Sequence, residues 1–300
     1  MSDARGIPGS FMFAAAVILG GLMLGVWSAC GGSDAKPTPS PTTPGTSANS
    51  PATASATATA DANVKGDITV FAASSLTDAF TAAGKSFETA HPGTKVTFSF
   101  GASSALATQI NEGAPADVFA SADGTNMQVV TDKGGVTSST MFASNTPVVV
   151  VPKGNATVTS FADLQKPGIK IVLAAKHVPI GKYARQILTN ASGAGGIAPD
   201  FSTKVLANLK SEEANVRAVL SKVQLGEADA GIVYQTDIAA GAGDVTKIDI
   251  PGGYNVVAKY PVATVKSSKN APTAHAFVDY ILSDPGQAIL AKYGFGKPGS

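Results

Sequence analysis

Hydrophobic and polar positions change their period repeatedly along the chain from about residue 67 onward. Short apolar runs, such as residues 68–73 and 170–175, predict buried strands. Stretches with apolar residues at helical spacing follow them, as in residues 76–90 and 179–191. This alternation is typical of α/β proteins, in which helices cover both faces of mostly parallel sheets.

The strand–helix alternation occurs twice, which predicts two lobes with a cleft between them. The expected boundaries place residues 67–146 together with 261–300 in the first lobe and residues 147–260 in the second. The chain would then cross between the lobes near residues 145–148 and again near residues 259–262. In open α/β sheets, ligands bind outside the carboxyl ends of the strands, so the segments that follow strands are the ones to inspect.

The N-terminal part has a different pattern. An apolar run from Phe11 to Cys30, with Arg5 upstream, has the form of an export signal. Ser28 and Ala29 lead into Cys30, which resembles a bacterial lipoprotein signal (residues 1–30) with Cys30 as the lipidated first residue. The alternative is an uncleaved membrane anchor, since the run is just long enough to span a bilayer. Both interpretations tether the protein outside the cytoplasm, at the cell membrane.

Residues 31–66 consist mainly of Pro, Thr, Ser and Ala and contain almost no large apolar side chain. Such a segment buries too little surface to offset its chain entropy, so we expect a disordered tether. Net charge is +1, from 22 basic and 21 acidic residues, and this balance argues against a nucleic-acid partner. The single cysteine excludes an internal disulfide.

Hydroxyl groups and helix starts follow the strands of the folded part. Ser74 and Ser75 follow the first strand, Ser103 and Ser104 the second, and Tyr234 ends a later one. Helix N-termini carry unpaired N–H groups and a partial positive charge, so several of them aimed at one point bind an anion without Lys or Arg. A site made only of donors favours a fully deprotonated oxyanion of the sulfate or molybdate kind over phosphate.

Five motifs in these segments stand in order along the chain: ITVFAASSLTDAF, GASSALATQINEGAPADVFASAD, HVPIGKYA, NVRAVL and GIVYQTD. With YPVATVK and KYGF near the end, they resemble the substrate-binding proteins of molybdate ABC importers over nearly all of residues 67–295. The resemblance implies a two-lobed type II periplasmic binding protein that needs no cofactor. It would act as a monomer and deliver molybdate or tungstate to an ABC permease with its ATPase.

The resemblance also implies which residues hold the anion. The expected donors are the hydroxyl and backbone N–H groups of Ser75 and Ser103, the backbone N–H groups of Ile180 and Val216, and the Tyr234 hydroxyl. Ile180 stands where the family often has alanine, and residues 189–215 are expected to form a loop longer than is usual in the family. Ser74 and Ser104 are secondary candidates, which could instead cap helices.

Other functions remain open from the residues alone. The same fold could bind another oxyanion such as sulfate. A serine hydrolase with Ser75 as nucleophile and His177 as base is the enzymatic alternative, but the chain has no G-x-S-x-G motif. Asp117 and Asp123 flank a predicted strand end, and we interpret them as structural because no third metal ligand lies nearby in the sequence.

Overall fold

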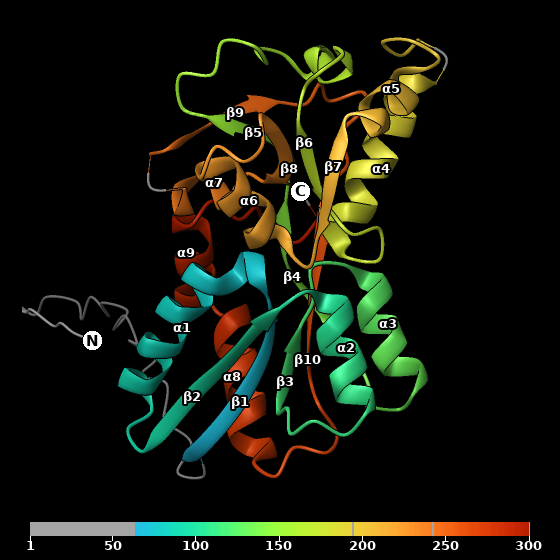
Figure 1. The fold of residues 1–300 in the computed structure, drawn as a ribbon. Coiled ribbons are helices and arrows are strands. Elements are labelled where there is room, and N and C mark those ends of the chain that lie inside the picture. The colour runs from blue at the N-terminus through green and yellow to red at the C-terminus, as the bar shows by residue number, and fades with distance from the viewer. Residues whose placement is uncertain (1–63, 194, 242, 300) are drawn as a thin grey trace, which may run out of the picture. The chain divides into compact units, whose positions relative to one another are not determined.

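The chain folds into two sheets with helices on their faces, which form two lobes (Figure 1). The structure is a computed structural model that describes residues 64–193, 195–241 and 243–299. The predicted signal segment with Cys30, and the tether up to residue 63, lie outside these residues. Among the residues described, no helix is long and apolar enough to cross a membrane.

The first lobe holds a sheet in the order β2-β1-β3-β10-β4. Its strands are β1 (Gly66–Ala73), β2 (Thr94–Gly101), β3 (Val118–Ala120), β4 (Thr140–Asn145) and β10 (Ala258–Thr264). Its helices are η1 (Ser74–Leu76), α1 (Thr77–Ala90), α2 (Ser103–Asn111), α3 (Gly124–Asp132), α8 (Ala271–Leu282) and α9 (Asp284–Lys292). Strand β1 pairs in parallel with β2 and β3, whereas β10 pairs antiparallel with β3 and β4.

Alternate side chains of β1 enter two different cores, because successive strand residues face opposite sides of a sheet. Val70 packs into the cluster that contains Phe80 of α1 and Phe277 of α8. Phe71 packs into the cluster that contains Leu106 of α2 and Met127 of α3. The sheet is therefore buried on both faces, which explains the nearly continuous apolar run that predicted this strand.

The second lobe holds a sheet in the order β7-β6-β8-β5-β9. Its strands are β5 (Pro147–Pro152), β6 (Ile171–Ala174), β7 (Leu209–Glu213), β8 (Ala230–Tyr234) and β9 (Val245–Asp249). Its helices are η2 (Phe161–Gln165), α4 (Pro179–Ser192), α5 (Phe201–Ala207), α6 (Val216–Gln224) and α7 (Asp237–Ala240). Strand β6 pairs in parallel with β7 and β8, and β5 pairs antiparallel with β8 and β9.

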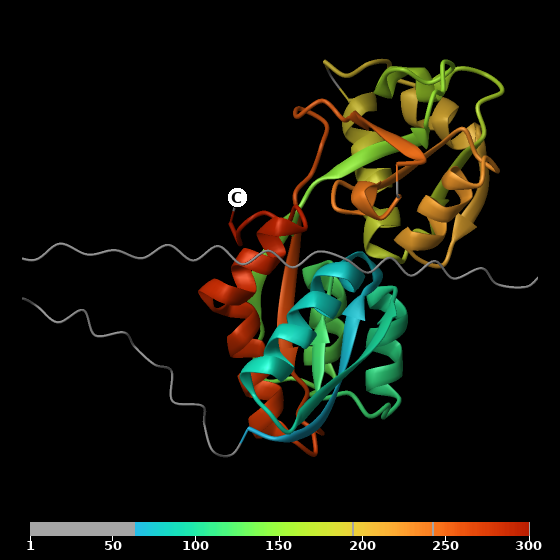
Figure 2. The same ribbon diagram turned by 90° about the vertical axis from the view of Figure 1, so that its left-hand side faces the viewer.

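One strand in each sheet runs against the others, and these two strands carry the chain between the lobes. A single residue, Thr146, separates the end of β4 from the start of β5. Strand β10 brings the chain back to the first lobe, where its first residue, Ala258, pairs with Asn145. Figure 2 shows the two crossings next to each other on one side of the molecule. A strand that enters from the other lobe starts at the cleft edge of its sheet. The other strands end at that edge, so the entering strand is antiparallel to them.

The structure changes several details of the prediction. Residues 258–260 were assigned to the second lobe, but their pairing with β4 places them in the first sheet. The stretch 189–215 is not one loop, since it contains the end of α4, helix α5 and the edge strand β7. Helix α3 and strand β4 were not predicted at all. Both have polar, weakly periodic sequences, and tertiary pairing decides such segments more than local pattern does.

Candidate functional site

A small cavity between the lobes collects the residues that the motifs predicted. Its lining includes Ser74, Ser75, Ser103, Ile180, Val216 and Tyr234. The centre of a water-sized sphere can move through only about 10 Å³ of this space, roughly what one water molecule needs, so a large organic ligand does not fit. The first lobe contributes the serines, and the second lobe contributes the other three side chains.

Helix N-termini from both lobes converge on this cavity. Residues in the first turns of η1, α2, α4 and α6 line it. No side-chain hydrogen bond caps η1, α2 or α4 among the described residues, and their N-cap positions hold Ala73, Ala102 and Val178. First-turn N–H groups have no partner within a helix. The cavity is therefore surrounded by backbone donors, and the serines at η1 and α2 are not N-caps.

Ser103 is oriented by a backbone group. Its side chain is fully buried, and its Oγ accepts a hydrogen bond of 2.9 Å from the Ala122 N–H. Since an N–H can only donate, the hydroxyl hydrogen of Ser103 is not used in this contact. Ser103 can therefore donate its hydrogen to an acceptor in the cavity.

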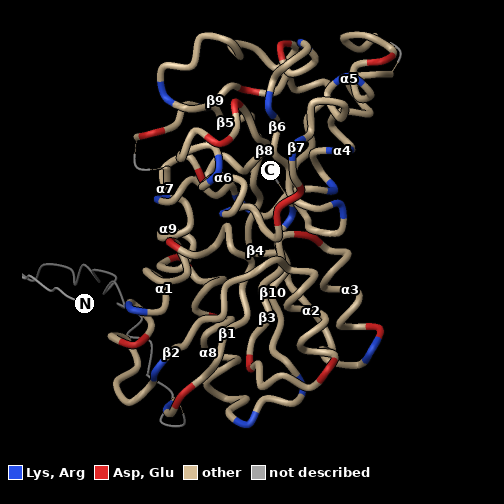
Figure 3. The backbone as a smooth tube through the Cα atoms, viewed as in Figure 1, with Lys and Arg blue, Asp and Glu red and all other residues tan. Residues whose placement is uncertain are grey.

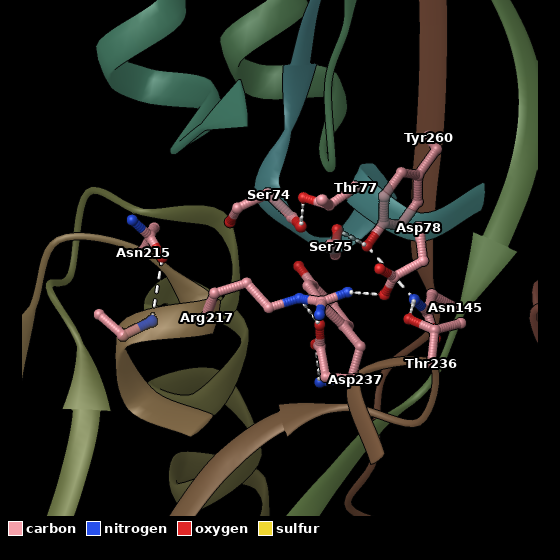
Figure 4. Close-up of polar contacts among 12 residues, drawn as sticks. Ser74, Ser75, Thr77, Asp78, Asn145, Asn215, Arg217, Thr236, Asp237 and Tyr260 are labelled. Carbon is pink, nitrogen blue, oxygen red and sulfur yellow. Dashed lines mark hydrogen bonds and ion pairs between the residues drawn. The ribbon is translucent and has the colours of Figure 1, made fainter. Parts of the chain in front are cut away.

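Ser75 has a partner that the sequence-based site did not include. Its Oγ lies 2.9 Å from the hydroxyl of Tyr260 on β10, and both residues are buried (Figure 4). Tyr260 belongs to the YPVATVK stretch that entered the resemblance, but nothing in that stretch alone distinguishes a site residue from a core tyrosine. Burial raises the pKa of Tyr260 well above its usual value, so its hydroxyl keeps its proton at neutral pH.

Tyr234 presents a buried hydroxyl to the cavity. The residue is 1% exposed, and its hydroxyl has no hydrogen-bond partner among the described residues. Burial, reinforced by Tyr260, Tyr183 and nearby carboxylates, raises its pKa well above the usual value, so the group remains a donor. An unpaired buried polar group costs about 1–3 kcal/mol, and a ligand with an acceptor atom removes that cost.

The side chains of Ile180 and Val216 are buried apolar groups. They are 1% and 3% exposed, and both belong to the main hydrophobic core. The isoleucine where the family often has alanine is therefore accommodated by core packing. At these two positions only the backbone N–H groups are suited to contact an anion.

Charged groups stand just outside the cavity rather than in its lining. Arg217, next to Val216, lies 2.8 Å from Asp78 of the first lobe and 2.9 Å from Asp237 of the second (Figure 4). Asp237 is fully buried and accepts a hydrogen bond from the Tyr234 N–H at 3.0 Å. Burial raises the pKa of Asp237 to about 6, and the Arg217 charge partly offsets this effect. Over the described residues, charges of both signs are scattered across both lobes (Figure 3).

Ser104 and His177 lie together in a separate groove, which Thr125 and Lys182 also line. The Ser104 Oγ is buried there without a hydrogen-bond partner among the described residues, so Ser104 does not join the cavity. The hydroxyl partner of Ser75 is Tyr260, not His177, so the structure gives no support to a serine–histidine pair. Asp123 caps α3 by accepting from the Asn126 N–H at 2.9 Å, as its structural interpretation requires.

The sequence matches, over residues 68–296, the family described as bacterial extracellular solute-binding protein. The chain belongs to this family. This membership confirms a solute-binding protein outside the cytoplasm.

Similar proteins agree with the family. The molybdate-binding protein ModA of Mycobacterium tuberculosis (strain H37Rv) is 41% identical over 233 residues, which cover 77% of this chain and 85% of that protein. ModA of Escherichia coli (strain K12) is 35% identical over 240 residues, covering 77% and 89%. The solved structure of the sulfate-binding protein SubI from M. tuberculosis matches with a TM-score of 0.70 at 21% identity, covering 78% and 88%. That last likeness shows the fold, and it confirms the predicted two-lobed architecture.

Proposed function

We propose that this protein captures molybdate, or tungstate, between its lobes and delivers it to an ABC permease with its ATPase. The observation that carries this proposal is the cavity lined by hydroxyl groups and helix N-termini from both lobes, including a Tyr234 hydroxyl with no hydrogen-bond partner among the described residues. The names and the 41% and 35% identities of the two ModA relatives support molybdate as the ligand.

The proposed contacts divide between side chains and backbone. Ser75, Ser103 and Tyr234 donate through their hydroxyls, and Ser75 and Ser103 also through their N–H groups. Ile180 and Val216 donate only through the backbone. Hydrogen bonds to charged groups contribute about 1.5–3 kcal/mol each, so a handful of them, less the cost of association, gives roughly micromolar to nanomolar affinity. Ser74 lines the same cavity and is a secondary donor.

Contacts to both lobes explain how binding is coupled to closure. A ligand that touches both lobes binds the closed form more tightly than the open form, so it shifts the population toward closure. Neither step requires a reaction, and in this proposal the protein is a carrier without cofactor rather than an enzyme. Attachment to the membrane through a lipid on Cys30 would keep the carrier beside its permease.

Sulfate is the second candidate ligand, because the sulfate-binding protein SubI shares the fold. Sulfate is also a fully deprotonated tetrahedral dianion, so donor chemistry alone does not distinguish it from molybdate. The difference between the two anions is size, and the cavity dimensions in the loaded protein decide which one fits.

Calorimetric titration tests the proposal. A soluble fragment must keep Lys65, because the Lys65 N–H donates a hydrogen bond to the Thr273 hydroxyl. The fragment 57–300 is titrated with molybdate, tungstate, sulfate and phosphate. Tight binding of molybdate and tungstate with no heat from sulfate or phosphate is the expected result. Tight sulfate binding alone would assign the site to sulfate, and silence with all four anions would refute an oxyanion carrier.

A further inference from the structure

Three side chains form a hydrogen-bonded chain that ends at the cavity. The Asn145 Nδ2 lies 3.4 Å from the Tyr260 hydroxyl, and that hydroxyl lies 2.9 Å from the Ser75 Oγ (Figure 4). Asn145 ends β4 at the crossing between the lobes, Tyr260 lies on β10, and Ser75 lies in η1. All three residues are buried, at 3%, 0% and 3% exposure, so bulk water does not compete for these groups.

The direction of this chain is determined by the backbone at Asn145. The Asn145 Oδ1 accepts a hydrogen bond of 2.9 Å from the Thr146 N–H, which fixes the side-chain amide in one of its two orientations. Its Nδ2 therefore faces the Thr236 hydroxyl, at 2.9 Å, and the Tyr260 hydroxyl. An amide NH₂ group can only donate, so the Tyr260 oxygen is the acceptor in that contact.

In this series of hydrogen bonds, the orientation of each group constrains the orientation of the next. Because the Tyr260 oxygen already accepts from Asn145, its own hydrogen is available to donate to the Ser75 oxygen. The 2.9 Å contact allows either hydroxyl to donate. When Tyr260 donates, the Ser75 oxygen is the acceptor on the protein side, and its hydrogen is free to point into the cavity. Ser103 has the same arrangement, with the Ala122 N–H in place of the tyrosine. In that arrangement both serines accept a hydrogen bond from the scaffold and offer a hydrogen to the ligand.

We propose that Tyr260, oriented by Asn145, is a positioning residue that holds Ser75 as a hydrogen-bond donor and thereby selects fully deprotonated oxyanions. This inference rests on the proposed oxyanion function. A serine hydroxyl without such a partner can rotate and accept a hydrogen from a protonated oxyanion such as hydrogen phosphate. With the partner in place, the hydrogen of the ligand would meet the hydrogen of Ser75, and one buried donor would remain unpaired.

The test is a double-mutant cycle between Tyr260→Phe and Ser75→Ala, read as molybdate affinity by calorimetry. The Tyr260 ring packs edge-on against Phe142, Tyr234 and Phe295, and phenylalanine keeps these contacts. We expect Tyr260→Phe to weaken molybdate binding about three- to thirtyfold in the wild-type background. In the Ser75→Ala background, the same substitution should change affinity by less than about twofold, because the group that it positions is gone.

The matched control is Tyr280→Phe, which deletes an equivalent tyrosine–serine hydrogen bond, 2.7 Å from Tyr280 to Ser86, on the exposed surface. It should leave molybdate affinity unchanged. A second readout is phosphate, whose affinity relative to molybdate should rise in Tyr260→Phe. If Tyr260→Phe does not fold, Asn145→Ala tests the same chain and should shift both quantities in the same direction.

The outcomes separate this inference from the proposed function. Wild-type protein that binds none of the four oxyanions refutes the function and the positioning role together. Wild-type binding of molybdate, with an equal loss from Tyr260→Phe in both backgrounds, shows a general structural effect and refutes the positioning role alone. Unchanged affinity and unchanged phosphate discrimination in Tyr260→Phe would also refute it.

Discussion

The ion pair between Arg217 and Asp78 is the contact whose removal most directly tests how the closed form is held. Arg217 is the second residue of α6 in the second lobe, whereas Asp78 lies in the first turn of α1 in the first lobe. The guanidinium is already fixed by Asp237, so the pair with Asp78 is the part of the network that links the lobes. Asp78→Asn removes the charge that crosses the cleft and leaves the Arg217–Asp237 pair in place.

The expected magnitude follows from the exposure of the pair. The two side chains are 24% and 47% exposed and 2.8 Å apart, so solvent screens their attraction strongly. Exposed ion pairs contribute about 0.2–1 kcal/mol, and the upper half of this range applies because Arg217 loses little additional freedom. Asp78→Asn should therefore destabilise the closed form by about 0.5–1 kcal/mol, which corresponds to a two- to fivefold change in an equilibrium constant.

Dissociation of radiolabelled molybdate, chased with unlabelled molybdate, measures this effect. The ion pair joins the two lobes, so it must break when they separate, and the dissociation rate should rise two- to fivefold while the association rate stays the same. Raising the salt concentration should accelerate dissociation from the wild type and have little effect on the variant. The control is Asp200→Asn, which removes an exposed ion pair with Lys204, 3.0 Å long, within the second lobe. Equal dissociation rates in Asp78→Asn and the wild type at low salt would refute the reasoning.

Three further predictions concern the site and its support. Ser103→Ala should weaken molybdate binding by about 1–3 kcal/mol in calorimetry, and unchanged affinity would remove Ser103 from the site. Gly181→Ala should reduce molybdate affinity at least about tenfold, because the added Cβ overlaps the carbonyl oxygens of Ala174 and Ala175 and displaces the start of α4. The control Gly253→Ala has open space around its added Cβ and should leave the affinity unchanged. Asp237 has its pKa raised to about 6 by burial, so its contribution to stability is complete below about pH 4 and is lost as the pH rises through 6. The free energy of unfolding should therefore gain about 1 kcal/mol from this group between pH 7 and pH 5, and urea unfolding of Asp237→Asn should lack that gain.

The elements that the sequence predicted well are those whose apolar pattern is unambiguous. Strands such as β1 and β5 are buried on both faces and read as continuous apolar runs, and α4 and α6 carry one clear apolar stripe. Strand β7, with the sequence LKSEE, has no such pattern because it lies at the edge of the sheet and is only partly buried. Its pairing with β6 determines its structure, and that partner lies more than thirty residues away.

Prediction from the sequence reached the residues that line the cavity but not the residues behind them. Serines placed after strands, at helix starts, are visible in the sequence, and so their gathering around one cavity could be predicted. The partners behind them could not, because Tyr260 is separated from Ser75 by 185 positions and reads as an ordinary apolar strand residue. Arg217 and Asp78 are likewise 139 positions apart, and their pairing depends on how the lobes meet.

In the proposed mechanism, selection and retention of the ligand belong to different groups. A lysine or arginine in the cavity would attract both protonated and deprotonated anions. Oriented neutral donors distinguish these two forms of the anion, because each donor needs an acceptor atom opposite it. The charges of Arg217, Asp78 and Asp237 stand outside the lining, where they act between the lobes instead of on the ligand. Substitutions in the Asn145–Tyr260 chain should therefore alter which oxyanion binds, and substitutions at Asp78 should alter how long it stays.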